Sequence, residues 1–355
     1  MTTSDAIDEH LYRIGLMIRP LRPGLTQRRR LIHHPVMMLL IIFAMIFIRT
    51  MCMITKNERT LTMLGDIGHF FGIRFHHNLL IVLLDSFVPI SQIIYYISHR
   101  RGVKPTFLKP FQVLFGMANP LVLGLKLKDV TRLKFLSRKY FAILRFNCDY
   151  GITSSCFVLI VALYAINTSL STTLLYGVPA AIHLTLTGHY FWNVLGYQFL
   201  YFYLVCKYLI MKFVSLNCQV ASSRDSKHQG MMMNMIRSFT RVCQEIQDYD
   251  ESYFSKFLFI SCFLYSSAIV IFLNIEIFSD VPFTLKIVIF YIMIIQVSIF
   301  LITIMTAASV NYHAKKMYCH LNSLFISYLN YPSIDDMNHH LLMIKMITLI
   351  ERIAK

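Results

Sequence analysis

Charged residues are scarce in this sequence, and acidic residues are the scarcest. Only 15% of the 355 residues are charged, whereas a soluble globular chain carries roughly 25%. Hydrophobic residues make up 56% of the chain, and the mean hydropathy is +0.56. The shortage of charge argues against an ordinary soluble domain and is typical of a chain that is largely surrounded by lipid.

Motifs that carry chemistry are also missing. The sequence has no GxSxG nucleophile, no Walker or GxGxxG phosphate loop and no CxxC pair. It also has no TVGYG filter and no span with a cation at every third position, which argues against a potassium channel and a voltage sensor. The adjacent histidines His33-His34, His76-His77 and His339-His340 cannot face one ligand on a helix, unlike the histidine boxes of intramembrane metal enzymes. We therefore predict no enzyme activity, no metal site and no cofactor.

Positive charge is present, and it alternates along the chain. The sequence holds 34 Lys and Arg against 18 Asp and Glu. Segment 99–145 carries eleven of the cations and a single acid, Asp129, whereas the hydrophilic gap 167–173 carries no charge. Because Lys and Arg near the ends of spans stay in the cytoplasm, this pattern predicts a cytoplasmic amino terminus. Retention of Lys and Arg on the cytoplasmic side and their attraction to anionic lipid headgroups account for the excess of positive charge. Nucleic-acid binding is therefore not expected.

Long apolar stretches predict the fold class, an all-α polytopic membrane helical bundle. A helix needs about twenty mostly apolar residues to cross the hydrocarbon core. Six stretches qualify: 33–54, 75–98, 146–167, 173–206, 255–278 and 282–308. The first lies too late for a cleaved signal peptide and has no Ala-x-Ala site. We expect a cytoplasmic segment at 1–32, a transmembrane domain at 33–310 and a cytoplasmic helical anchor region at 311–355.

Two further segments help to fix the topology. The stretch 107–125 is apolar, but two prolines and its basic flanks favour an interfacial or re-entrant segment over a span. The only glycosylation sequon begins at Asn167, in a predicted outer loop where modification is possible.

Amphipathic patterns outside the spans predict cytoplasmic helices. The fourth span is longer than a bilayer and is expected to tilt or to continue into the cytoplasm. The sixth span keeps helical periodicity past its end, through Met317, Leu321 and Leu324. A second pattern covers 335–355, with Asp335 and Asp336 as a candidate cap. A third is the stripe of Met235, Phe239, Val242, Ile246 and Tyr249.

Polar residues inside apolar spans are the candidate ligand-binding residues, because such residues are costly in lipid. Asp85 lies about ten residues into the second span, where it could contact a ligand, pair with a cation or bond to a neighbouring helix. In the fourth span His189 and Trp192 lie within one helical turn and could line a cavity for a small organic molecule. Tyr291 and Gln296 of the sixth span complete the set. Helix–helix packing is the alternative role for all of these side chains.

The carboxyl-terminal third resembles a known family. The stretch Ala307-Ala308-Ser309-Val310, then Ala314-Lys315-Lys316 and Leu321-Asn322-Ser323-Leu324, is similar to the end of the sixth helix of arthropod gustatory receptors. The later stretch His339-His340-Leu341-Leu342 with Ile350-Glu351-Arg352-Ile353 resembles the cytoplasmic helix that precedes their last span. The inside amino terminus and the long fourth span also agree with this family.

The resemblance implies a ligand-gated cation channel at the plasma membrane. In such receptors a seventh span with a Thr-Tyr-(hydrophobic)5-Gln-Phe signature lines the pore of a tetramer, and this sequence ends at Lys355, before that signature. We therefore expect a truncated chain, with the signature encoded beyond codon 355. The implied partners are a small-molecule tastant, membrane lipids and other receptor subunits in a homo- or hetero-tetramer.

Two rival classes stay open at this point. A G-protein-coupled receptor would have an outside amino terminus and seven spans, which the charge pattern opposes. A secondary transporter would show an internal repeat, and residues 33–167 and 173–308 show no evident symmetry.

Overall fold

The computed structural model describes residues 35–64, 66, 68, 72–100, 123–143, 146, 171, 178–222, 229–279 and 283–329. Within these residues all regular secondary structure is helical. The chain divides into two compact units. Unit 1 comprises Met1–Lys104, Ser137–Tyr201 and Tyr253–Ile302, and unit 2 comprises Pro105–Leu136, Phe202–Ser252 and Thr303–Lys355. The prediction of an all-α chain is confirmed for the described residues.

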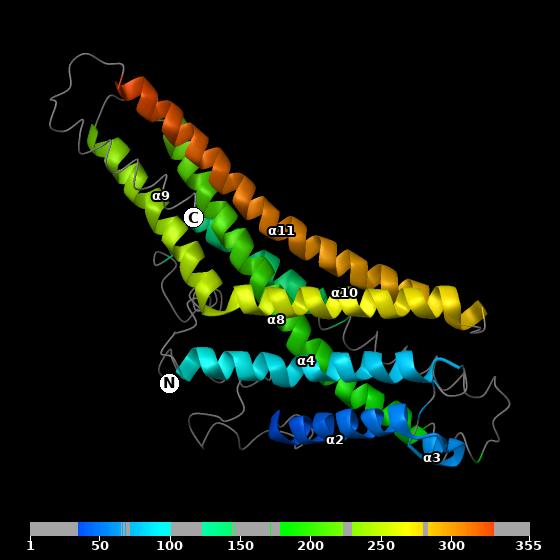
Figure 1. Ribbon diagram of the computed structural model, residues 1–355. Coiled ribbons are helices and arrows are strands. Elements are labelled where there is room, and N and C mark those ends of the chain that lie inside the picture. The colour runs from blue at the N-terminus through cyan, green and yellow to red at the C-terminus, as the bar shows by residue number, and fades with distance from the viewer. Residues whose placement is uncertain are drawn as a thin grey trace. The chain divides into compact units, whose positions relative to one another are not determined.

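Helix α4 is the central helix among the neighbours described in unit 1. Helix α2 (Pro35–Ile54) packs along one side of α4 (Arg74–Arg100), and α10 (Ser255–Phe278) packs along another side (Figure 1). Proline suits the first position of α2, because a residue in the first helical turn has no intrahelical partner for its N–H. The short helix α3 (Glu58–Met63) lies in the connection from α2 to α4.

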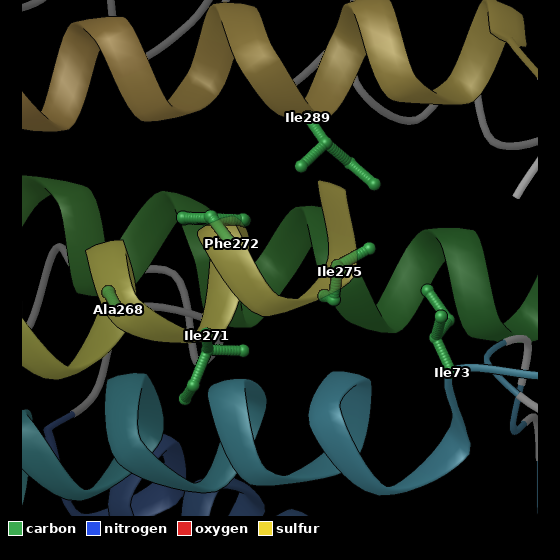
Figure 2. Packing of buried hydrophobic residues seen from close by; sticks show 6 residues of the cluster. All are labelled: Ile73, Ala268, Ile271, Phe272, Ile275 and Ile289. Atoms are coloured by element: carbon green, nitrogen blue, oxygen red, sulfur yellow. The ribbon is translucent and has the colours of Figure 1, made fainter. Parts of the chain in front are cut away.

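An apolar seam joins α4, α10 and the first part of α11 (Phe283–Leu329) in unit 1. Its buried residues come from the start of α4, one face of α10 and one position of α11 (Figure 2). They are Ile73, Ala268, Ile271, Phe272, Ile275 and Ile289. The i, i+3, i+4, i+7 spacing on α10 places its four members on one helical face. The seam fixes α10 between two neighbours.

Two helices are far longer than a bilayer is thick. Helix α8 (Val178–Ser222) has 45 residues and α11 has 47. At 1.5 Å per residue they extend for roughly 70 Å, against a hydrocarbon core of about 30 Å. The predicted continuation of the fourth and sixth spans as helices is therefore confirmed. Met317 and Leu321, on the continuation of α11, are fully buried.

Helix α9 (Gln229–Tyr249) carries the predicted amphipathic stripe. Four of its five members are buried and Ile246 is half-buried. Phe239 of this stripe contacts Phe213 of α8, with ring centroids 6.0 Å apart. A π-helical turn, η7 (Asp250–Phe254), then leads into α10.

Five of the described helices contain a stretch long and apolar enough to cross a bilayer. These stretches are Met37–Ile54, Arg74–Ile94, Val194–Ser222, Ser255–Phe278 and Ile289–Leu324. Their exposed side chains are large and apolar, as at Phe259, Phe263 and Met305, which suits contact with lipid or with another subunit. The predicted span 146–167 lies almost wholly outside the described residues. Two windows reach further along the chain than the predicted spans 173–206 and 282–308, because their helices continue without a break.

Candidate functional site

A group of polar side chains, all buried except the half-buried His77, lies at and next to the interface of α2 and α4 in unit 1. We call Arg49, Asp66, His77, Asn78 and Asp85 the Arg49 cluster. Arg49 is 6% exposed and Asn78 is fully buried, and Arg49 Nη1 donates a hydrogen bond of 3.3 Å to Asn78 Oδ1. Asn78 Nδ2 in turn donates to the carbonyl oxygen of Arg74, at 2.8 Å. A charge inside an apolar helix is costly, so these contacts hold Arg49 in a defined position.

Arg74 joins the start of α4 to the end of α2. Its Nη1 and Nη2 atoms donate to the carbonyl oxygens of Thr55 and Met53, at 2.8 Å and 3.1 Å. The last carbonyl groups of a helix have no intrahelical donor, so a guanidinium group there satisfies acceptors that would otherwise lack a partner. The connection between the two helices is thereby fixed at both of its ends.

Asp66 brings a buried carboxylate to the same end of α4. It is 1% exposed, and its Oδ1 atom lies 3.6 Å from His77 Nδ1. Burial opposes ionisation of Asp66, but His77, Asn78 and Arg49 favour the charged form, so its pKa lies below the ordinary value. The backbone passes close by at Gly68, where an added Cβ would lie 2.7 Å from His77 Cβ, so only glycine fits without a shift.

Asp85 lies on the same face of α4 as Asn78, two turns further along the helix. It is 7% exposed and interacts electrostatically with Arg49. Among the described residues, its buried Oδ2 atom has no hydrogen-bond partner, and neither carboxylate oxygen of Asp66 has one. Pro89 lies inside α4 and has no N–H, so the helical hydrogen bond to the carbonyl of Asp85 cannot form. The helix is therefore locally weakened where its buried carboxylate lies.

The other predicted ligand-binding residues are placed as follows. His189 and Trp192 lie on α8, and their side chains are outside the described part of the structure. Tyr291 is exposed and Gln296 is buried, so the two residues lie on different sides of α11. Asn167, the glycosylation candidate, is outside the described residues. Of the predicted set, only Asp85 is placed by the structure in a described polar cluster.

A contact next to the predicted fourth-span residues links α4 to α8 within unit 1. Gln92, two turns beyond Asp85 on α4, has its Nε2 atom 3.4 Å from the hydroxyl oxygen of Tyr190, the neighbour of His189. Deeper in unit 1, Phe199 of α8 contacts Phe257 and Tyr265 of α10. Tyr265 is 3% exposed, and its hydroxyl has no hydrogen-bond partner in the part of the chain that the structure describes. The α4–α8–α10 contacts therefore combine aromatic rings with polar groups, as small-molecule sites do.

Unit 2 contains a second polar group, which sequence reasoning did not single out. We call Tyr208, Lys212, Glu245 and Tyr249 the Glu245 cluster. The Tyr208 and Tyr249 hydroxyls donate to Glu245 Oε1, at 3.0 Å and 2.9 Å, and Lys212 Nζ lies 2.6 Å from Oε2. Lys212 Nζ also lies 4.7 Å from the centre of the Tyr208 ring, a cation–π contact. Burial and the neighbouring Glu245 raise the pKa of Tyr249, so its hydroxyl stays protonated and donates.

Sequence signals for the two clusters differ. Arg49 is a charged residue within the first apolar stretch, so its burial among helices could have been predicted from the sequence. Asp85, an equally unusual charge of opposite sign, would then have been its expected partner. Lys212 and Glu245 are 33 residues apart on different helices. No local pattern connects them. Among the described residues no group of three or more His, Cys, Asp or Glu side chains could hold a metal ion.

Comparison with known proteins adds no family to this description. No protein-family model matches the chain, and no curated protein matches it. The helices themselves define the class: the chain is a polytopic, all-α membrane protein.

Proposed function

We propose that the chain is a chemosensory receptor of the gustatory type. It acts as a subunit of a ligand-gated cation channel in the plasma membrane, with a cytoplasmic amino terminus and a small organic tastant as ligand. The working form is a homo- or hetero-tetramer with other receptor subunits. No catalytic step is part of this function.

The observation that carries the proposal is the continuation of α8 and α11 far beyond bilayer length. Helices of 45 and 47 residues reach well outside the hydrocarbon core. The stretch that resembles gustatory receptors, Ala307 to Leu324, lies on the continuation of α11. In unit 2 the continuation of α8 packs with the amphipathic α9 through Phe213 and the Glu245 cluster. Helices longer than the hydrocarbon core is thick support a receptor whose subunits assemble through the helical ends that extend past it.

The Arg49 cluster supports a gating role for α4. A buried carboxylate beside a helical proline gives α4 a point at which it can bend, because one backbone hydrogen bond is missing there. A ligand that prefers one bend of α4 shifts the equilibrium between closed and open channels by its difference in affinity for the two states. Asp85 and Gln92 on one face of α4 are the residues through which such a ligand acts most directly.

Current recording tests the channel proposal. The chain is expressed alone and together with gustatory receptor subunits, and whole-cell currents are recorded during application of sugars, bitter alkaloids and amino acids. We expect a ligand-evoked cation current far above the turnover rate of a transporter. Asp85→Asn should shift the dose–response curve, whereas the matched change Glu251→Gln at an exposed position should not. Ligand uptake without conductance, or no response in any combination, would reject the channel.

Epitope accessibility tests the orientation independently. A tag at the amino terminus should be stained only after the plasma membrane is permeabilised. Staining of intact cells would reject the gustatory-receptor topology and favour the G-protein-coupled class.

A further inference from the structure

The helix at residues 127–143 exposes a face on which cations surround an aromatic ring. Lys128, Arg132 and Lys139 are exposed. Phe135 lies between them on the helical surface and is 67% exposed. The spacing of these four residues, i, i+4, i+7 and i+11, keeps them on one side of the helix. The opposite side is buried through Val130, Leu133 and Ser137.

Within the described part of the chain, the positive charge of this face is not neutralised by acidic side chains. Among the described residues no acidic side chain forms an ion pair with Lys128, Arg132 or Lys139. Asp129 is the only acid on the helix, and it is half-buried. Apolar groups continue along the exposed side, since Leu127 is 73% exposed and Ile143 is 43% exposed. Cations interleaved with exposed apolar side chains are the pattern of a helix that lies at a membrane surface.

Both ends of the helix lie next to segments that the sequence predicts to enter the bilayer. At its start, the hydroxyl of Tyr208 lies 3.4 Å from the carbonyl oxygen of Leu123. Tyr208 lies between Lys207 and Lys212, two residues past the predicted end of the fourth span but inside the longer apolar window Val194–Ser222. At its other end, the predicted third span begins at residue 146. Because Lys207 and Lys212 are cations that favour the bilayer surface, we expect the helix to run close to the level of the lipid headgroups, where phosphate groups are the available anions.

We propose that the face formed by Lys128, Arg132, Phe135 and Lys139 binds a membrane lipid with a phosphate-rich headgroup, a phosphoinositide. The three cations bind the headgroup phosphates, and Phe135 with Leu127 contacts the upper acyl chains. Three cations within one helical face favour several phosphates on one headgroup over a single phosphodiester. This site is independent of the proposed channel activity.

Direct binding to the purified chain tests the site. The protein is placed in phosphatidylcholine nanodiscs and titrated with short-chain phosphatidylinositol bisphosphate, short-chain phosphatidylserine and free inositol trisphosphate. We expect the bisphosphate lipid to bind more tightly than either other probe. Serine lipid binding equally well would overturn the preference for phosphate-rich headgroups, and the free headgroup binding equally well would overturn the lipid as the ligand.

Matched triple variants locate the site. Lys128→Gln, Arg132→Gln and Lys139→Gln together should weaken binding of the bisphosphate lipid by about a hundredfold, since each cation near an anionic surface contributes severalfold. The control carries three equal changes at exposed positions on α9 and α11: Arg241→Gln, Lys315→Gln and Lys316→Gln. It should leave the affinity unchanged. Equal losses in the two variants would mean that only net charge matters and would overturn the site.

A fluorescence variant tests the placement even if the triple variant folds poorly. Trp192 is the only tryptophan, so Trp192→Phe with Phe135→Trp reports from position 135 alone. Lipids brominated near the glycerol backbone should quench this tryptophan strongly, whereas iodide in the water phase should quench it weakly. Quenching by iodide alone would place position 135 in water and overturn the proposal.

Discussion

The Arg49 cluster is built around buried charge and the Glu245 cluster around half-buried charge, and their hydrogen bonding differs. Glu245 receives a donor from two tyrosines and one lysine, so each of its carboxylate oxygens has a partner. In the Arg49 cluster, Asp66 and Asp85 keep buried carboxylate oxygens without hydrogen bonds. A satisfied group stabilises one arrangement of helices, whereas an incompletely satisfied one stays close in energy to other arrangements. The hydrogen bonds therefore specify the packing of helices more completely at the Glu245 cluster than at the Arg49 cluster.

Removing Glu245 is expected to have the largest effect. Glu245→Ala removes the acceptor of Lys212 and Tyr249 and the nearer acceptor of Tyr208. The loss of three hydrogen bonds to one charged group should cost about 3–5 kcal/mol. Thermal unfolding in detergent, followed by tryptophan fluorescence or light scattering, measures the loss. Glu251→Ala on the exposed surface is the matched control and should cost less than about 0.5 kcal/mol. A small loss of stability in Glu245→Ala would show that this cluster does not hold the helices together.

Removing Arg49 is expected to have the next largest effect. Arg49→Met should destabilise the chain by about 2–3 kcal/mol, because Asp66 and Asp85 lose their shared positive neighbour. Adding Asp85→Asn should recover part of the loss, since the buried charge left behind is then neutral. Additive losses in the double variant would show that Arg49 and Asp85 do not interact.

Two tyrosine variants compare a hydroxyl that has a hydrogen-bond partner with one that has none among the described residues, and their expected effects on stability are smaller. Tyr249→Phe removes a hydrogen bond of 2.9 Å to Glu245 and should cost about 1–2 kcal/mol. Tyr265→Phe removes a buried hydroxyl with no partner and should be neutral or slightly stabilising. Unfolding curves of the two variants, recorded side by side, test this difference. If Tyr265→Phe abolishes a ligand response while leaving stability unchanged, the hydroxyl serves the ligand.

The smallest expected effect is confined to acid pH. Because the pKa of Asp66 is lowered in the folded chain, its contribution to stability is complete above the ordinary value of 3.8 and is lost as pH falls through the lower folded value. Asp66→Asn should therefore flatten the acid side of the stability profile and leave its shape near neutral pH unchanged. Melting temperatures across the acid range measure this. An unchanged acid profile would show that Asp66 is not held ionised by its neighbours.

The sequence predicted more of the fold than of the site. Apolar length identified the helices of the first, second, fifth and sixth spans, because lipid requires a long run of apolar residues. Amphipathic spacing identified the buried stripe of α9. Tyr291 and Gln296 could not be separated in the same way, because an apolar helix has no polar side to show which face is buried.

The partners of the candidate residues could not be predicted from the sequence, because they lie on other helices. Asp85 stood out alone, since one acid in a span is unusual whatever its neighbours are. Its neighbour Arg49 and the Lys212–Glu245 pair depend on which helices pack together, and each pair joins residues on different helices.

The sequence by itself determined that this protein is a helical chain with several spans. Hydrophobic runs and the spacing of apolar residues act along the chain, so they can be read without knowing the packing. Only the tertiary structure decided which buried charges meet and which carboxylate oxygens stay without a donor. Those contacts depend on the register and rotation of helices far apart in sequence, which local composition does not specify.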